Sequence, residues 1–281
     1  MIREALDFPT SGDGGSRTLL VGSLLLLLAG GAATGAGYAL DDGRRPLAVV
    51  GSVAALVPLL AVRGYYYRAL AAAATRADPV APSFGDGRRL FREAFVATGI
   101  AVAYALPSVL LFAAAAGMTR LAGRTGATVE LLAQALGAVA ALLGIVSLVA
   151  ALYLTPAALA TVARSSDVRR AFRVRTITDG AATEDYVVGW VLATALQWTL
   201  APIGALLSSV GVGVVLYFLT AVATRYVFGA SFRAAVGSDG VPTVGITPSN
   251  RARSEAELQE MVLNADVYAD SREADSPDRP R

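Results

Sequence analysis

The chain of 281 residues contains no cysteine and no histidine, and because it also lacks lysine, all 24 of its basic residues are arginine. The lack of cysteine excludes disulfides, thiolate nucleophiles and cysteine-ligated iron–sulfur clusters. The lack of histidine removes the usual zinc and haem ligand and the side chain that carries protons near neutral pH. The lack of lysine excludes a Walker A site and a Schiff base, and nucleophile-elbow and dinucleotide-loop motifs are also missing. We therefore expect no enzymatic activity, catalytic residue, metal site or cofactor, and no nucleic-acid partner.

Apolar residues dominate the sequence instead. Hydrophobic residues make up 55% of the chain and the mean hydropathy is +0.55, both above ordinary soluble usage. A membrane-spanning helix needs roughly 20 mainly apolar residues. Runs of about this length or longer, with few charges, occur at 18–40, 46–67, 95–118, 129–163, 186–207 and 212–232. The sequence therefore predicts an all-α fold, a polytopic membrane helix bundle with six transmembrane helices within 18–236.

Local signals predict details of the last two spans. Thr183, followed by two acidic residues, is a strong N-cap for the fifth span, because a hydroxyl can accept from the first free N–H groups and acids interact favourably with the helix dipole. Residues 186–232 carry a single charge, Arg225. The fifth and sixth spans should therefore form a hairpin that turns near 208–211.

The arginines gather in alternate connections between the predicted spans. The second-to-third and fourth-to-fifth connections hold Arg63, Arg68, Arg76, Arg88, Arg89, Arg92, Arg164, Arg169, Arg170, Arg173 and Arg175. The other connections hold Arg44, Arg45, Arg120 and Arg124. Because arginine-rich short loops stay in the cytoplasm, we expect a multi-pass protein of the cell membrane with both termini cytoplasmic. The cytoplasmic N-terminal segment 1–17 carries three acids, unlike a short basic signal leader, so we interpret the first run as a retained helix.

The C-terminal segment 237–281 has a different composition. It carries nine acids against five arginines and few apolar residues, which predicts an acidic, largely disordered cytoplasmic tail. Within it, Ser254 and Glu257 form a capping-box pattern before an apolar helical face. A short helix there could bind a protein partner or the protein's own cytoplasmic face; a transient helix in a disordered tail is the alternative.

The pattern D-x-R-R-x-F-R occurs twice, at 86–92 and at 167–173. Each copy follows a tyrosine and an arginine eleven residues apart and precedes a span with a proline: Tyr65, Arg76 and Pro107 for the first copy, Tyr153, Arg164 and Pro202 for the second. The two copies are offset by two spans and so keep the same orientation. This order predicts a parallel internal duplication within 18–236, with chance similarity of a short arginine-rich pattern as the alternative.

Each copy also has the pattern of a short amphipathic helix lying in the membrane interface. Ser83 can cap the first, whose apolar face comprises Leu90, Phe91, Ala94 and Phe95, and the apolar stripe of the second comprises Val168, Ala171 and Phe172. The adjacent basic residues are Arg88, Arg89, Arg92, Arg169, Arg170 and Arg173. An arginine near an anionic leaflet contributes about 1 kcal/mol of attraction. We hypothesise that these six arginines bind lipid headgroups; alternatively, they only enforce topology.

Proline interrupts four of the predicted spans, at Pro58, Pro107, Pro156 and Pro202. Each proline leaves a backbone carbonyl without its helical donor, which in transporters can line a substrate cavity, although a packing kink is the simpler interpretation. The central parts of the spans carry no Asp or Glu, which argues against a proton-coupled pump. We interpret Gln134 and Gln197 as interhelical hydrogen-bonding groups.

A series of motifs runs along the chain: ALDFPTSGD, LLVGSLLLL, RGYYYRAL, PSFGDGRRLFREAF, YLTPAALATVAR with DVRRAF, and YVVGWVLA. This series resembles the uncharacterised archaeal integral membrane proteins grouped as domain-of-unknown-function family four thousand and thirteen. The motifs cover roughly 5–236 in order, although the family usually has Trp where this chain has Gly87. The resemblance implies several membrane-spanning helices and brings no known activity or catalytic residue.

Two functions fit these observations. The first is a non-enzymatic accessory or scaffold protein with an arginine-rich, lipid-facing cytoplasmic surface. The alternative is a permease-like or lipid-handling transporter that uses the proline-broken helices. The expected partners are membrane lipids with anionic headgroups, and a homo-oligomer and a protein bound to the C-terminal tail are further options.

Overall fold

The computed structural model describes residues 2–12, 14–123 and 127–237. These residues belong to a compact unit, Met1–Gly240, and a second unit comprises Val241–Arg281. The predicted tail with its capping box at Ser254 lies outside the described residues. All regular secondary structure in the described part is helical, which confirms the all-α prediction there.

Six long helices account for most of the described chain. They are α2 (Gly15–Asp41), α3 (Arg45–Thr75), α4 (Gly87–Ala122), α5 (Ala127–Ser165), α7 (Glu184–Leu206) and α8 (Val212–Val236). All six are long and apolar enough to cross a membrane, and they correspond in order to the six predicted spans. The shorter elements are α1 (Ile2–Asp7), η1 (Phe8–Thr10), η2 (Val168–Phe172), α6 (Val174–Ala181) and η3 (Leu207–Val210). The prediction of six membrane-length helices is confirmed.

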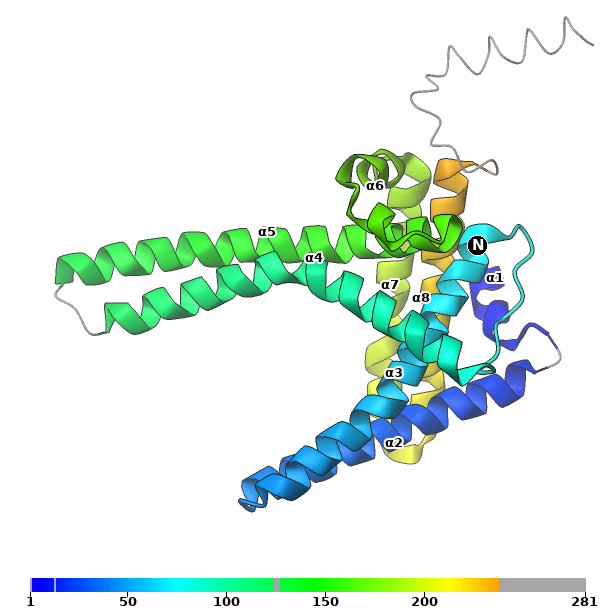
Figure 1. Cartoon of the computed structure of the whole chain (residues 1–281), viewed down its shortest axis with the longest axis horizontal. Helices are drawn as coiled ribbons and strands as arrows, with labels where there is room; N and C mark the ends of the chain where they lie inside the picture. Colours follow the sequence, from blue (N-terminus) through cyan, green and yellow to red (C-terminus); the bar gives the residue numbers. More distant parts are fainter. Residues whose placement is uncertain (1, 13, 124–126, 238–281) are drawn as a thin grey trace, which may run out of the picture. The chain divides into compact units, whose positions relative to one another are not determined.

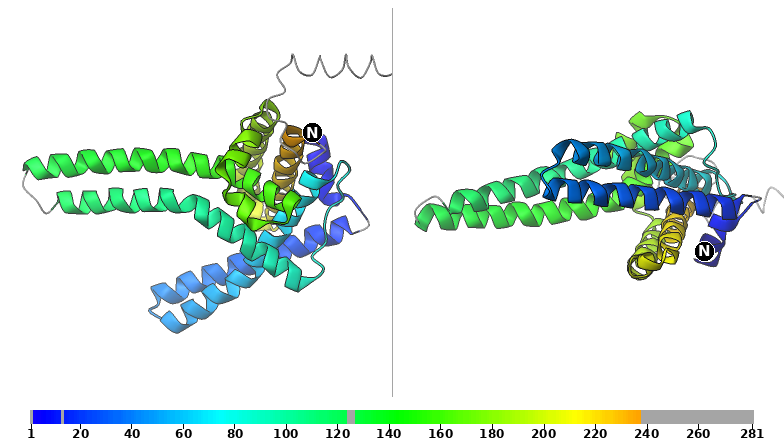
Figure 2. Two further views of the ribbon diagram at one scale, coloured as in Figure 1. Left: turned by 45° about the horizontal axis from the view of Figure 1, so that its top comes forward. Right: turned by 90° about the horizontal axis from the view of Figure 1, so that it is seen from below.

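The long helices pack as three hairpins, because each pair is joined by a short connection. Helix α2 pairs with α3, α4 with α5, and α7 with α8, and Figures 1 and 2 show the first two pairs side by side in each view. Helix α8 also packs against α3, α2 and α5. It is the most enclosed of the six, with 61% of its most apolar window buried. The core of the unit therefore forms around α8 and the C-terminal half of α3.

Glycine permits the close approach of α8 to its neighbours. A Cβ atom at Gly229 of α8 would overlap the Leu70 carbonyl oxygen of α3, and a Cβ atom at Gly189 of α7 would overlap Ser231 of α8. Phe218 of α8 is fully buried and lies against Gly22 of α2. Small residues let helix backbones approach closely in membrane bundles, where packing and not water exclusion drives helix association.

Large apolar side chains remain exposed along the same helices. Trp198 and Leu206 of α7 are 76% and 81% exposed, and Leu131 of α5 is 71% exposed. Soluble proteins do not present contiguous apolar faces of this extent to water, whereas lipid-facing helices do. These faces and the six long helices indicate a multi-pass membrane protein.

The first predicted interfacial helix is wrong as a separate element. Residues from Gly87 onward form the first turns of α4, which continues without a break to Ala122. Its N-cap is Asp86, whose Oδ1 accepts a hydrogen bond from the Arg89 backbone N–H at 3.2 Å. The predicted cap, Ser83, instead accepts from the Gly85 N–H within the preceding connection. No proline or helix-ending glycine separates the surface turns from the span, so the helix propagates through both.

The second predicted interfacial helix is divided. Asp167 caps the 3-10 helix η2 by accepting from the Arg169 N–H at 2.9 Å, and α6 begins after Arg173. Within the predicted apolar stripe, Ala171 is buried while Val168 and Phe172 are exposed. The stripe splits because a 3-10 helix has three residues per turn, so its side chains do not follow the period of an α-helix.

Two local predictions about the last hairpin are confirmed. The Thr183 hydroxyl accepts a hydrogen bond from the Tyr186 backbone N–H at 3.4 Å, as expected of the N-cap of α7. The chain turns through η3 and Gly211, whose φ of 77° lies in the region that glycine adopts without steric cost.

Candidate functional site: an arginine-rich end of the helices

Two arginines tie together the C-terminal ends of three helices. From α5, Arg164 donates through Nη1 to the Ala74 carbonyl at the end of α3 (3.0 Å) and through Nη2 to the Gly237 carbonyl after α8 (3.1 Å). From α8, Arg233 donates through Nη1 to the Ala73 carbonyl at 2.7 Å. The last carbonyls of a helix have no intrahelical donor and carry partial negative charge. These arginines therefore stabilise the helix ends and bring α3, α5 and α8 together.

A partly buried ion pair joins α3, about two turns before its C-terminal end, to the first turns of α4. Arg68 of α3 donates through Nε to Glu93 Oε2 of α4 at 2.5 Å, with side chains only 14% and 12% exposed. The other Glu93 oxygen, Oε1, accepts from Arg89 Nε at 2.8 Å. One carboxylate thus serves two guanidinium groups, which accounts for an acidic residue among the arginines in the first turns of α4.

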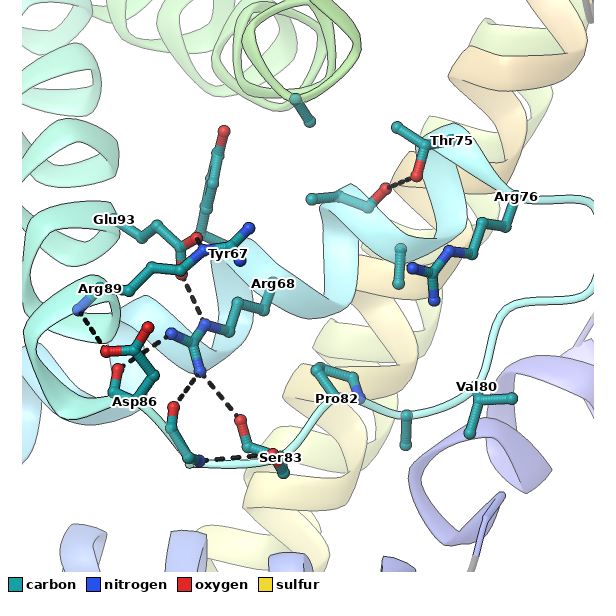
Figure 3. A pocket seen from close by; sticks show the side chains of 15 residues that line it. Tyr67, Arg68, Thr75, Arg76, Val80, Pro82, Ser83, Asp86, Arg89 and Glu93 are labelled. Atoms are coloured by element: carbon teal, nitrogen blue, oxygen red, sulfur yellow. Dashed lines mark hydrogen bonds and ion pairs between the residues drawn. The ribbon is translucent and has the colours of Figure 1, made fainter. Parts of the chain in front are cut away.

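The rest of the Arg68 guanidinium holds the connection between α3 and α4. Nη1 donates to the carbonyls of Ser83 (3.1 Å) and Gly85 (2.6 Å), and Nη2 donates to the carbonyl of Asp86 (3.2 Å). Figure 3 shows these bonds converging on one side chain. The planar guanidinium suits this role because it presents five donors in a rigid arrangement. Arg68 thereby sets the path of the chain into the first turn of α4.

An open cavity of about 740 Å³ lies beside this ion pair. Its walls come from α3, the following connection and the start of α4, with Ala163 of α5 completing the lining. The ionisable or hydroxyl-bearing residues around it are Tyr67, Arg68, Thr75, Arg76, Ser83, Asp86, Arg89 and Glu93 (Figure 3). Three arginines thus line the cavity with two acids. Within the described chain Arg76 has no ion pair, so the cavity can attract an anionic group.

The structure does not gather the six arginines that we predicted as headgroup ligands into one site. All six are exposed: Arg88, Arg89 and Arg92 in the first turns of α4, Arg169 and Arg170 in η2, and Arg173 before α6. Arg89 alone among them lines the cavity. Arg89 bonds to Glu93, and Arg170 Nε lies 3.9 Å from Asp167 Oδ2. The other four have no ion-pair partner in the parts of the chain that the structure describes.

A family model described as a protein of unknown function (DUF4013) matches residues 47–209, which is more than half of the chain. The chain belongs to the DUF4013 family. The matched region runs from the start of α3 to η3 and contains the cavity, both copies of the repeated pattern and all four span prolines. No curated protein and no solved structure matches the chain. Family membership therefore assigns no activity to the cavity.

The four span prolines of this DUF4013 protein lie inside continuous helices, and none of them lines the cavity. Pro58 and Pro156 are buried, whereas Pro107 and Pro202 are exposed. A common polar pathway would require the freed carbonyls to face one another. The mixed exposure of the four prolines therefore favours the interpretation that each produces a packing kink.

The polar side chains at depth connect helices of the DUF4013 protein in two places. Thr224 of α8 donates to Gln197 Oε1 of α7 at 3.2 Å, which confirms the predicted interhelical role of Gln197. Ser108 of α4 donates to Ser147 Oγ of α5 at 3.1 Å. The same prediction is wrong for Gln134, whose amide donates to Glu130 one turn earlier in its own helix. Spacing alone could have indicated that intrahelical pair, because residues four apart are neighbours on a helix surface.

Local sequence patterns did not reveal the roles of Arg68, Glu93, Arg164 and Arg233. Their partners lie far along the chain: 90 residues separate Arg164 from Ala74, and 160 separate Arg233 from Ala73. The sequence offered one signal, the position of Glu93 four residues after Arg89, which favours an ion pair on one helix face.

Proposed function

We propose that this protein is a non-enzymatic accessory or scaffold protein of the cell membrane whose arginine-rich cytoplasmic surface binds anionic lipid headgroups. The observation that supports the proposal is the state of the six surface arginines, Arg88, Arg89, Arg92, Arg169, Arg170 and Arg173. All are exposed, and four have no ion-pair partner among the described residues. Unpaired guanidinium groups keep their full attraction for phosphate oxygens.

Exposed apolar side chains lie in the same segments. Phe95 is 63% exposed one turn after Arg92, and Phe172 and Val174 flank Arg173 with exposures of 52% and 64%. A segment that combines apolar anchors with cations suits the membrane interface, where rings insert among acyl chains and guanidinium groups reach the phosphates. Each such arginine would contribute about 1 kcal/mol of attraction to an anionic leaflet. The surface turns of α4 and the η2–α6 segment would therefore lie in the interface, on the cytoplasmic side together with both termini.

The test compares two triple variants of the full chain in nanodiscs of mixed phosphatidylglycerol and phosphatidylcholine. R88Q/R92Q/R169Q removes three unpaired surface arginines. The control, R44Q/R45Q/R120Q, removes three exposed arginines from the connections α2–α3 and α4–α5 at the other helix ends. We expect phosphatidylglycerol to be enriched around the wild type and the control, and this enrichment to be lost in the first variant. Equal enrichment in all three proteins would contradict the proposal.

The alternative is a permease-like or lipid-handling transporter. The observation in its favour is the open cavity of about 740 Å³ beside Arg68 and Glu93, because transport requires a place for a substrate. The cavity contains none of the span prolines, so a substrate path would have to use other groups. Proteoliposome assays of lipid translocation, with Arg76→Gln to alter the cavity and Arg44→Gln as control, distinguish the alternatives: Arg76-dependent translocation would support the transporter.

A further inference from the structure

Arg225 and Arg63 each lie more than ten residues from either end of a membrane-length helix, and neither is one of the six surface arginines. Arg225 belongs to α8, about 16 Å along the helix from its last residue, Val236, at 1.5 Å per residue. Arg63 belongs to α3, about 18 Å from its last residue, Thr75, on the same measure. Both helices are long and apolar enough to cross the membrane, and they pack against each other. Two positive charges are thus carried into the apolar part of one helix pair.

In the described part of the chain, the groups found in contact with Arg225 are aromatic rings, and none is a carboxylate. Its Cζ atom lies 5.9 Å from the ring centre of Tyr66 and 5.8 Å from that of Phe228. Arg63 lies one turn before Tyr66 in α3, so it brings a second positive charge and not a counter-charge to this side of the helix pair. Neither guanidinium has a hydrogen-bond or ion-pair partner in the described parts of the chain. Cation–π contacts offset only part of the cost of a charge in hydrocarbon, and two like charges add to that cost.

The phenol of Tyr66 forms a group with the two arginines, Arg63 and Arg225. Arg63 and Tyr66 are three residues apart and so share a face of α3, and the Tyr66 ring lies against Arg225. The Tyr66 hydroxyl is buried and has no hydrogen-bond partner. Buried hydroxyls are nearly always bonded, so this unused donor points to a ligand that accepts from it. Phe218 walls the group, with its ring 5.7 Å from that of Tyr66.

We propose that Arg63, Arg225 and the Tyr66 hydroxyl together bind one phosphate group, and that a phospholipid from the surrounding bilayer supplies it. A phosphate has several acceptor oxygens and negative charge, which match two guanidinium forks and one hydroxyl. Bound between the two arginines, it would replace their mutual repulsion with two attractions. The proposal does not rest on the surface arginines, none of which belongs to this group.

The exposure of α3 favours a lipid over a soluble phosphate. The Arg63 residue is exposed, so the group opens to the surroundings of the helix. Leu59 and Leu56 precede Arg63 by four and seven residues, lie on the same helix face and are 44% and 54% exposed. An acyl chain could lie along this face toward the bilayer centre while its phosphate contacts Arg63 and Arg225.

The experiment uses the full chain, delipidated in mild detergent, with thermal unfolding and native mass spectrometry as readouts. Phosphatidylglycerol should bind one molecule per chain and raise the wild-type unfolding temperature. Diacylglycerol with the same acyl chains should do neither. R63Q and R225Q should each lose at least tenfold in affinity, while the control R44Q should bind as the wild type does. Without lipid, R225Q should be at least as stable as the wild type, because the substitution eliminates a buried charge. If Arg225 had only a structural role, R225Q would be less stable than the wild type.

Two further measurements decide whether the phosphate site exists and which ligand occupies it. Inorganic phosphate that raises the unfolding temperature in an Arg63-dependent way and displaces phosphatidylglycerol would support a phosphate site supplied by a soluble ligand. Affinity for phosphatidylglycerol within twofold of wild type in both R63Q and R225Q would overturn the proposal. If R225Q does not fold, the exposed R63Q decides alone. The lipid enrichment that depends on Arg88, Arg92 and Arg169 is measured separately, so either proposal can fail without the other.

Discussion

The Glu93 carboxylate accepts a hydrogen bond from Arg68 Nε at 2.5 Å, and this contact joins the first turns of α4 to the C-terminal half of α3. Both side chains are largely buried, and Arg68 uses its remaining donors on carbonyls of the α3–α4 connection. The pair therefore lies at the point where the surface connection becomes a membrane-length helix.

Loss of this carboxylate should destabilise the protein strongly. Glu93→Gln leaves Arg68 and Arg89 without their shared partner, and removal of one member of a buried pair costs about 3 kcal/mol or more. The unfolding temperature in detergent should fall by several degrees. Asp7→Asn is the control, because the Arg3–Asp7 pair at 3.9 Å is highly exposed and such pairs contribute less than about 1 kcal/mol. Equal effects of the two substitutions would show that the Arg68–Glu93 pair has no special role.

Removal of the Arg164 guanidinium should loosen the ends of α3 and α8. Arg164→Gln loses charge-assisted bonds to the Ala74 and Gly237 carbonyls, each worth about 1.5–3 kcal/mol. Amide hydrogen exchange should accelerate in the last turn of both helices while the centre of α8 stays protected. Arg175→Gln is a suitable control, because the Arg175 side chain is exposed. Unchanged exchange in R164Q would refute the capping role.

Two glycine substitutions should have opposite effects. In Gly229→Ala the new Cβ would overlap the Leu70 carbonyl oxygen, so α3 and α8 must separate and the unfolding temperature should fall sharply. In Gly35→Ala the new Cβ meets no atom within 4 Å, and alanine is the better helix former by about 1 kcal/mol. That variant should be as stable as the wild type or slightly more stable. A tolerated G229A would mean that the α3–α8 contact is looser than described.

The Asp86 cap should tolerate asparagine better than alanine. Its φ of 51° lies in the left-handed region, which asparagine adopts more readily than alanine, and its side-chain oxygen accepts from the Arg89 N–H. Asp86→Ala loses both advantages and should cost about 1 kcal/mol or more of stability, whereas Asp86→Asn should cost much less. Thermal unfolding of the two variants gives the comparison, and similar losses would argue against the capping bond.

The absence of native cysteine makes the topology directly testable. Single cysteines at two exposed positions, Asp42→Cys after α2 and Asp78→Cys between α3 and α4, report on opposite ends of α3. A membrane-impermeant maleimide added to intact cells should label D42C and spare D78C, because we place the α3–α4 connection in the cytoplasm. Labelling of D78C in intact cells would reverse the assignment of the termini.

Features that depend on nearby residues could be predicted from the sequence. The six long helices follow from apolar runs that match the thickness of a bilayer, and the α7 cap follows from Thr183 and the acids after it. The same local reasoning failed at Asp86, where it placed a separate interfacial helix. Nothing in that segment ends a helix, so the surface turns and the span became one element. Helix continuity depends on what lies on both sides of a segment, and amphipathic spacing alone does not report it.

By itself, the sequence determined that this chain carries six membrane-length helices and a basic end, because hydrophobic length and charge are properties of contiguous residues. Only the tertiary structure decided what the arginines contact: Arg233 reaches a carbonyl 160 residues away, Arg68 closes on Glu93, and Arg225 faces the side of α3 that carries Arg63 and Tyr66. Such contacts depend on which helix faces pack together. That choice is made by close backbone approaches such as Gly229 against Leu70, which no local pattern encodes.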